Sequence, residues 1–102
     1  MQSLIGLSAQ AVADALRQRG IVSIRVEEWT ESEVGVIELS PAIAVTVTPD
    51  GCRVRAGLVK PSGPQWEVGP PVDVVESLVA AIKKAQWKVA MSRRQFNQGG
   101  VA

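Results

Sequence analysis

The stretch that decides the fold is Ala42–Lys60, AIAVTVTPDGCRVRAGLVK. On each side of Pro49-Asp50-Gly51, apolar residues alternate with residues that suit a less buried surface, the period of a strand covered on one face. The tripeptide itself favours a tight turn, so the stretch predicts an antiparallel hairpin. Its core face is expected to carry Ile43, Val45, Val47, Cys52, Val54, Ala56 and Leu58, and its solvent face Thr46, Thr48, Arg53 and Arg55.

Other strands are predicted on both sides of this hairpin. Ile21–Trp29 alternates Val22, Ile24 and Val26 with polar residues, Val34–Leu39 is a shorter apolar segment, and Gln65–Val68 suits a short last strand. The chain holds 22 valines and isoleucines but only 6 leucines, a bias that favours pleated structure.

Two segments have helical periodicity. In Ser8–Arg19, apolar residues recur at the spacing of one helix face, Ser8 can cap the start, and Gly20 suits the left-handed residue that ends a helix. Asp73 to Arg93 is the longest element, and Asp73 with Glu76 has the spacing of a capping box. Its apolar stripe consists of Val75, Leu78, Val79, Ile82, Ala85 and Val89.

This order of elements predicts a two-layer α+β fold. Consecutive strands with short links pair in an antiparallel way, and each helix has one apolar stripe to bury. We expect a sheet of four to five strands with the N-terminal helix and the long C-terminal helix packed on one face. Residues 1–94 form the single domain, and 95–102 form a flexible C-terminal tail.

The composition argues against most enzymatic chemistry. The chain has 102 residues, no histidine, one cysteine and a net charge of +1. Without histidine there is no Ser-His or Cys-His pair and no histidine-ligated metal, and no glycine-rich phosphate loop is present. Cys52 is interpreted as a buried structural thiol, and a carboxylate pair of Glu28 with Glu38 or Glu31 is singled out by no spacing. We therefore expect no enzymatic activity, no cofactor and no metal.

The compartment is predicted from what the sequence lacks. No apolar run approaches the ~20 residues of a membrane helix, and Met1–Gly20 has no basic leader. A lone cysteine gives no indication of an oxidising compartment. These features predict an intracellular, cytoplasmic protein without a membrane partner.

Charge is divided unevenly along the chain. Residues 1–50 hold seven acids and three bases, net −4, whereas 51–102 hold three acids and eight bases, net +5. On a helical wheel at about 100° per residue, Trp87 and Met91 fall among the cations of the last helix, away from the apolar stripe. The candidate interaction residues are Lys83, Lys84, Trp87, Lys88, Met91 and Arg94.

Three interpretations of this basic face are open. Trp87 can be covered by the Leu4–Leu7 segment, by another loop or by a second copy; it can anchor a different protein; or it can stack a nucleic-acid base. The acidic stretch Glu27–Glu33 is interpreted as a solvated loop, and Trp29 and Trp66 as closing the ends of the core.

The sequence thus predicts a small non-catalytic interaction module, such as an adaptor, an inhibitor, a chaperone-like protein or an assembly protein. It is expected to act through protein–protein contacts and to self-associate as a homodimer. The alternative is a single-stranded nucleic-acid-binding protein that uses the basic face of the C-terminal helix, with Arg53 and Arg55 as a second stripe. Nucleic acid ranks below protein because the net charge is small.

Overall fold

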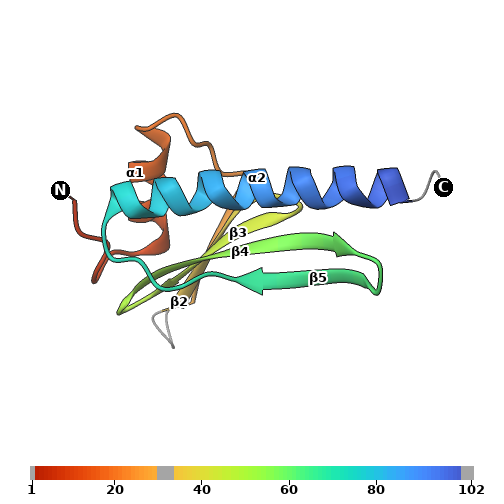
Figure 1. The fold of residues 1–102 in the computed structure, drawn as a ribbon. Coiled ribbons are helices and arrows are strands. Elements are labelled where there is room, and N and C mark those ends of the chain that lie inside the picture. The colour runs from red at the N-terminus through yellow and green to blue at the C-terminus, as the bar shows by residue number, and fades with distance from the viewer. Residues whose placement is uncertain (1, 30–33, 100–102) are drawn as a thin grey trace.

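The hairpin predicted from Ala42–Lys60 lies at the centre of the structure, a computed structural model that describes residues 2–29 and 34–99. Further strands flank it, and a helix lies at each end of the described chain (Figure 1). The elements are α1 (Ala9–Arg17), β1 (Arg25–Trp29), β2 (Val34–Ser40), β3 (Ile43–Thr48), β4 (Gly51–Lys60), β5 (Gly63–Val68) and α2 (Val75–Gly99). The predicted α+β class and the predicted order of elements are confirmed.

The five strands form one antiparallel sheet in the order β1-β2-β3-β4-β5. Each strand pairs with the next along the chain because the links are too short for a crossover. In the central hairpin Thr48 pairs with Gly51, so only Pro49 and Asp50 form the turn. Gly51 has a φ of 134°, and a Cβ there would lie 2.5 Å from the carbonyl oxygen of Val72. The turn therefore requires glycine for two independent reasons.

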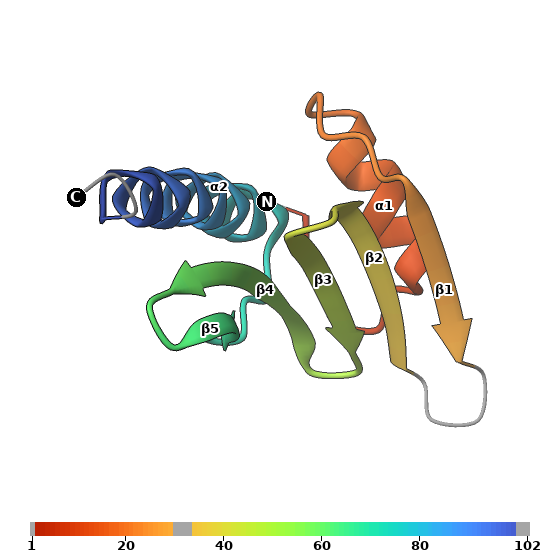
Figure 2. The same cartoon turned by 90° about the vertical axis from the view of Figure 1, so that its right-hand side faces the viewer.

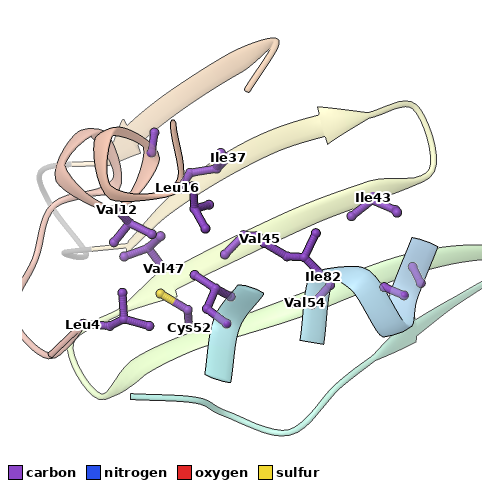
Figure 3. Packing of buried hydrophobic residues seen from close by; sticks show 14 of the residues in the cluster. Leu4, Val12, Leu16, Ile37, Ile43, Val45, Val47, Cys52, Val54 and Ile82 are labelled. Carbon is purple, nitrogen blue, oxygen red and sulfur yellow. The ribbon is translucent and has the colours of Figure 1, made fainter. Parts of the chain in front are cut away.

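Both helices cover the same face of the sheet (Figure 2). The α1 helix packs against β1 and β2, and α2 packs against β4 and β3. All the residues predicted for the core face of the hairpin are buried, and Cys52 lies among them (Figure 3). The largest fully buried side chains are Leu4, Leu16, Ile37, Leu78, Ile82, Val12, Val45, Val47, Val75 and Cys52.

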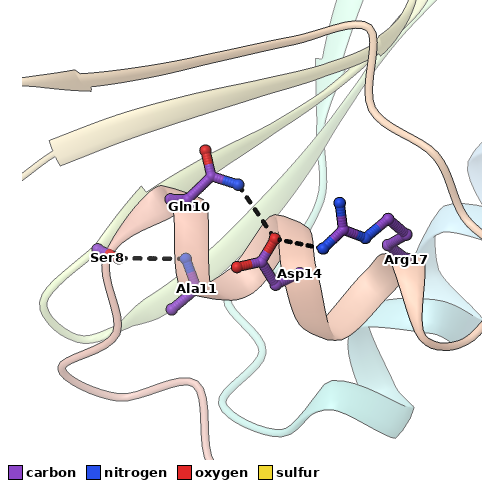
Figure 4. Close-up of polar contacts among 5 residues, drawn as sticks. All are labelled: Ser8, Gln10, Ala11, Asp14 and Arg17. Atoms are coloured by element: carbon purple, nitrogen blue, oxygen red, sulfur yellow. Dashed lines mark hydrogen bonds and ion pairs between the residues drawn. The ribbon is translucent and has the colours of Figure 1, made fainter.

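The ends of α1 follow the sequence prediction. The Ser8 hydroxyl accepts a hydrogen bond from the Ala11 backbone N–H at 3.1 Å (Figure 4). At the other end Gly20 has a φ of 83°, and the Ile21 N–H donates to the Leu16 carbonyl at 3.0 Å. This is the Schellman pattern, in which a left-handed residue lets the chain fold back on the last turn.

The first strand is shorter than predicted. It begins at Arg25, and Val22 and Ile24 are 68% and 63% exposed instead of facing the core. The pairing stops opposite Glu38, beside the irregularity of β2 between Glu38 and Ser40 where its register with β3 shifts. The last bond along this edge is from the Ile24 N–H to the Glu38 carbonyl.

The last helix differs from its prediction at both ends. It begins at Val75 rather than Asp73, and it continues to Gly99, so residues 95–99 of the expected tail are helical. The stretch after Arg93 contains no proline, so nothing in it removes a helical hydrogen bond. Residues 100–102, and residues 30–33 of the predicted acidic loop, lie outside the described residues.

The second face of the sheet is not covered by either helix. It carries Trp29 and Trp66, which are 49% and 53% exposed, so the interpretation that these indoles close the core is wrong. The register explains this placement, because Trp66 pairs with Gly57 and therefore shares the face of Arg55 rather than that of Ala56. The Trp66 ring lies against Gly57, where a Cβ would be 3.4 Å from it, and the Arg55 guanidinium lies 5.3 Å from the ring centroid.

Candidate interaction surface

The α2 helix separates its apolar ridge from its aromatic and basic residues, as the helical wheel predicts. Leu78 and Ile82 are fully buried against the sheet, and Ala85 and Val89 are almost so. Trp87, five residues after Ile82, is 64% exposed. The indole therefore faces away from the core of its own chain.

Four of the six predicted interaction residues line a hollow, and two do not. Trp87, Lys88 and Met91 line a groove of about 830 Å³, and Lys84 lines a smaller hollow of about 300 Å³ together with Lys88. Lys83 and Arg94 are exposed but belong to neither lining set. At about 100° per residue they lie within about 40° of Trp87, on its side away from Lys88, so they continue the exposed face of α2 outside the groove.

The β4–β5 hairpin supplies the opposite wall of the groove. Leu58, Val59, Lys60, Pro61 and Glu67 line it together with the α2 residues. The sequence alone does not indicate this wall, because the pairing of β5 is set by the fold. Alternation in β5 puts Glu67 on the face opposite Trp66, and its pairing with the core residue Ala56 places it on the side of the sheet that α2 covers.

An ion pair joins the two walls. Lys88 Nζ lies 2.6 Å from Glu67 Oε1, and both residues line both hollows, so the pair stands at the junction between them. The hydrogen bond and charge of Lys88 hold the pKa of the Glu67 carboxyl below its usual value, with smaller contributions from Lys60 and Lys84. Both side chains are partly exposed, so the pair contributes little to stability and can be exchanged for other partners.

Ser92 fixes the helix to the floor of the groove. Its Oγ accepts a hydrogen bond from the Val59 N–H at 3.2 Å, and its hydroxyl donates to the Val89 carbonyl at 3.0 Å. This bond joins α2 to β4 next to Met91. The groove is thus formed between anchored elements rather than between mobile loops.

The two basic stripes lie on different sides of the sheet. Arg53 and Arg55 are on the uncovered face, as predicted, where Arg53 donates to the Gly69 carbonyl. The α2 helix and its lysines are on the covered face. A single strand of nucleic acid that followed one stripe would leave the other unused.

The candidate catalytic groups are not brought together. Glu28 accepts a hydrogen bond from the backbone N–H of Gln10 in α1. Glu38 lies on the opposite face of the sheet, at the position of β2 that is opposite Arg25 in the strand register. Glu31 lies outside the described residues. Cys52 is buried as expected, and this burial raises the pKa of its thiol to about 11. A thiol with so high a pKa is not a nucleophile at neutral pH.

Two further searches within the described residues are negative. No three residues of the metal-ligating types are grouped to hold an ion, and neither helix has the length and apolar character needed to cross a membrane. Comparison of the chain with protein-family models, curated protein sequences and solved structures yields no significant match.

Proposed function

We propose that this protein is a small non-catalytic interaction module that binds another protein in the groove between α2 and the β4–β5 hairpin. The observation that supports this proposal most is the 64% exposure of Trp87 on the rim of that groove. An indole in water is apolar area that a partner can bury, and tryptophan is among the residues that most often dominate binding energy. Met91 beside it adds a flexible apolar side chain that adapts to the partner's shape.

The charge of the groove favours a partner of a different sequence over a second copy. Two copies joined through this groove about a two-fold axis would place the lysines that line both hollows of each copy in one interface, with Glu67 as the one acid among the described lining residues of each. Like charges opposed in this way disfavour the contact. The predicted homodimer stays a prediction.

Adaptor, inhibitor, chaperone-like and assembly roles all need only this kind of contact, and the proposal makes no choice among them. A cytoplasmic location is part of the proposal, since Cys52 is a free, buried thiol and needs no oxidising compartment. The alternative of single-stranded nucleic-acid binding has support from Arg55 stacked near Trp66 on the uncovered face. It ranks second because the α2 lysines lie on the other side of the sheet.

The double variant Trp87→Ala/Lys84→Glu tests the proposal. Proteins captured by immobilised wild type and variant are compared by quantitative mass spectrometry, and the Kd of each purified partner is then measured by calorimetry. Loss of a central tryptophan costs at least about 2 kcal/mol, or roughly 30-fold in Kd. Both positions are exposed, so the melting temperature should not change.

Trp29→Ala is the matched control, because it removes an exposed indole from the other face of the sheet and should leave Kd unchanged. The proposal fails if the double variant binds every partner as tightly as wild type, or if no partner is captured and light scattering gives the mass of one chain. Binding to oligothymidine that falls steeply with salt and is lost in Arg55→Ala would support the alternative.

A further inference from the structure

The lining of the groove combines apolar and basic residues. Leu58, Val59, Pro61, Trp87 and Met91 provide aliphatic, aromatic and thioether surface. Lys60 and Lys88 line the same groove, and Lys84 lies in the adjoining hollow. Among the described lining residues of both hollows, Glu67 is the one acid.

The lysines act on a single carboxylate. Lys88 binds Glu67 directly, and Lys60 and Lys84 are close enough to stabilise its charged form. Three ammonium groups around one carboxylate leave an excess of positive charge at the groove. A carboxylate from another molecule that entered here would meet the same stabilising field.

The apolar lining of the groove favours an acidic protein over nucleic acid as the negatively charged partner. A volume of about 830 Å³ with a largely apolar lining accommodates a bulky aliphatic or aromatic side chain. A nucleic-acid base can stack on Trp87, but the sugar–phosphate backbone has no apolar group to place on the aliphatic and thioether surface of Leu58 and Met91. The surroundings of Lys88 therefore suit a peptide that carries both an acidic and an apolar side chain.

We propose, building on the function proposed above, that the partner presents an acidic segment with one bulky apolar side chain, and that a carboxylate of this segment replaces Glu67 on Lys88. The apolar side chain enters the larger hollow beside Trp87 and Met91. Because Glu67 and Lys88 stand where the two hollows meet, displacement of Glu67 joins them into one continuous groove. Glu67 thus acts as an internal competitor that occupies the site until an acidic partner arrives.

Random peptides displayed on phage and selected against wild-type protein test this inference. Selection should enrich sequences in which Asp or Glu flank Leu, Phe or Trp, and their binding should be lost in Trp87→Ala. For the tightest acidic peptide, Glu67→Gln should lower Kd about two- to fivefold, because the competing carboxylate is gone. Glu76→Gln removes a different exposed, arginine-paired acid and should leave Kd nearly unchanged.

A second measurement follows Glu67 itself. Carboxyl-carbon NMR titration of the complex should show the pKa of Glu67 rising toward its ordinary value, since Lys88 is then held by the peptide. The competitor role is overturned if the pKa of Glu67 stays lowered in the complex. It is also overturned if Glu67→Gln leaves Kd unchanged or raises it. Enrichment of neutral or basic peptides that depend on Trp87 overturns the acidic partner while the proposed function stands. Peptides that bind independently of Trp87, or no enrichment at all, count against both.

Discussion

At the scale of single residues, glycine and tryptophan are placed by the register of the strands. Gly57 on β4 is directly opposite Trp66 on β5 in the strand register. The Trp66 ring covers the backbone at Gly57, which has no side chain of its own to cover it. Gly51 closes the central hairpin at a positive φ, with the Val72 carbonyl directly beside it. At Gly51 the missing Cβ is what allows two parts of the chain to meet.

We expect Gly51→Ala to lower the free energy of unfolding much more than Gly63→Ala. Both glycines have a positive φ, which an alanine adopts at a cost of about 1–2 kcal/mol. An alanine at Gly51 also meets backbone oxygen, which adds about 1–3 kcal/mol, whereas nothing lies within 4 Å of the added Cβ at Gly63. Urea denaturation measures both, and equal losses would contradict the close contact.

At the scale of elements, local chemistry sets the ends of α1, whereas tertiary context sets the ends of β1 and α2. The Ser8 cap and the Gly20 turn involve residues a few positions apart, so sequence alone predicts them. β1 starts at Arg25 opposite Glu38, where β2 becomes irregular, and this is not encoded near Val22 or Ile24. An alternating pattern therefore shows which residues suit a strand but not where its partner ends.

Ser8→Ala should cost about 1 kcal/mol of stability, because the Ala11 N–H then loses its acceptor at the first turn of α1. Ser62→Ala is the matched control. Among the described residues, its hydroxyl accepts a hydrogen bond only from the exposed side chain of Gln65, so the effect should stay within about 0.5 kcal/mol. Urea denaturation of the two variants compares them, and no difference between them would argue against the cap.

Some residues of the candidate site can be predicted from local sequence, whereas others join it only through tertiary contacts. Trp87, Lys88 and Met91 could be assigned to an exposed helix face, because their position relative to Ile82 follows from helical geometry. Glu67 and Pro61 could not, since they join the site only when the β4–β5 hairpin folds beneath α2. The wheel also places Lys83 and Arg94 beside Trp87, but neither of them lines the two hollows.

At the scale of the whole molecule, spatial order repeats sequence order. The strands lie side by side as they follow in the chain, so the acidic first half occupies the β1 side and the basic second half the β5 side. Figure 2 shows α1 with β1 and β2 at one end and α2 with the β4–β5 hairpin at the other. A charge difference along the sequence thereby becomes a difference between the two ends of a molecule 49 Å long.

The core as a whole determines the chemistry of Cys52. Its thiol has a pKa of about 11 in the folded chain and about 9 when exposed, so between these values the folded state holds the proton more tightly. Stability is therefore complete below pH 9 and falls as pH rises toward 11, by up to about 3 kcal/mol. The contribution of the thiol is the difference in the free energy of unfolding between wild type and Cys52→Ala, measured by denaturation from pH 8 to 11. If this difference does not change with pH, the prediction is contradicted.

The sequence alone determined the alternation that builds the central hairpin, the caps of α1 and the separation of ridge from indole on α2. These features depend on residues within a few positions of one another, where strand and helix periods apply directly. Only the tertiary structure decided that Trp29 and Trp66 lie on the uncovered face and that Glu67 meets Lys88. Such contacts join residues distant in the chain, and their geometry depends on strand register and on where α2 crosses the sheet.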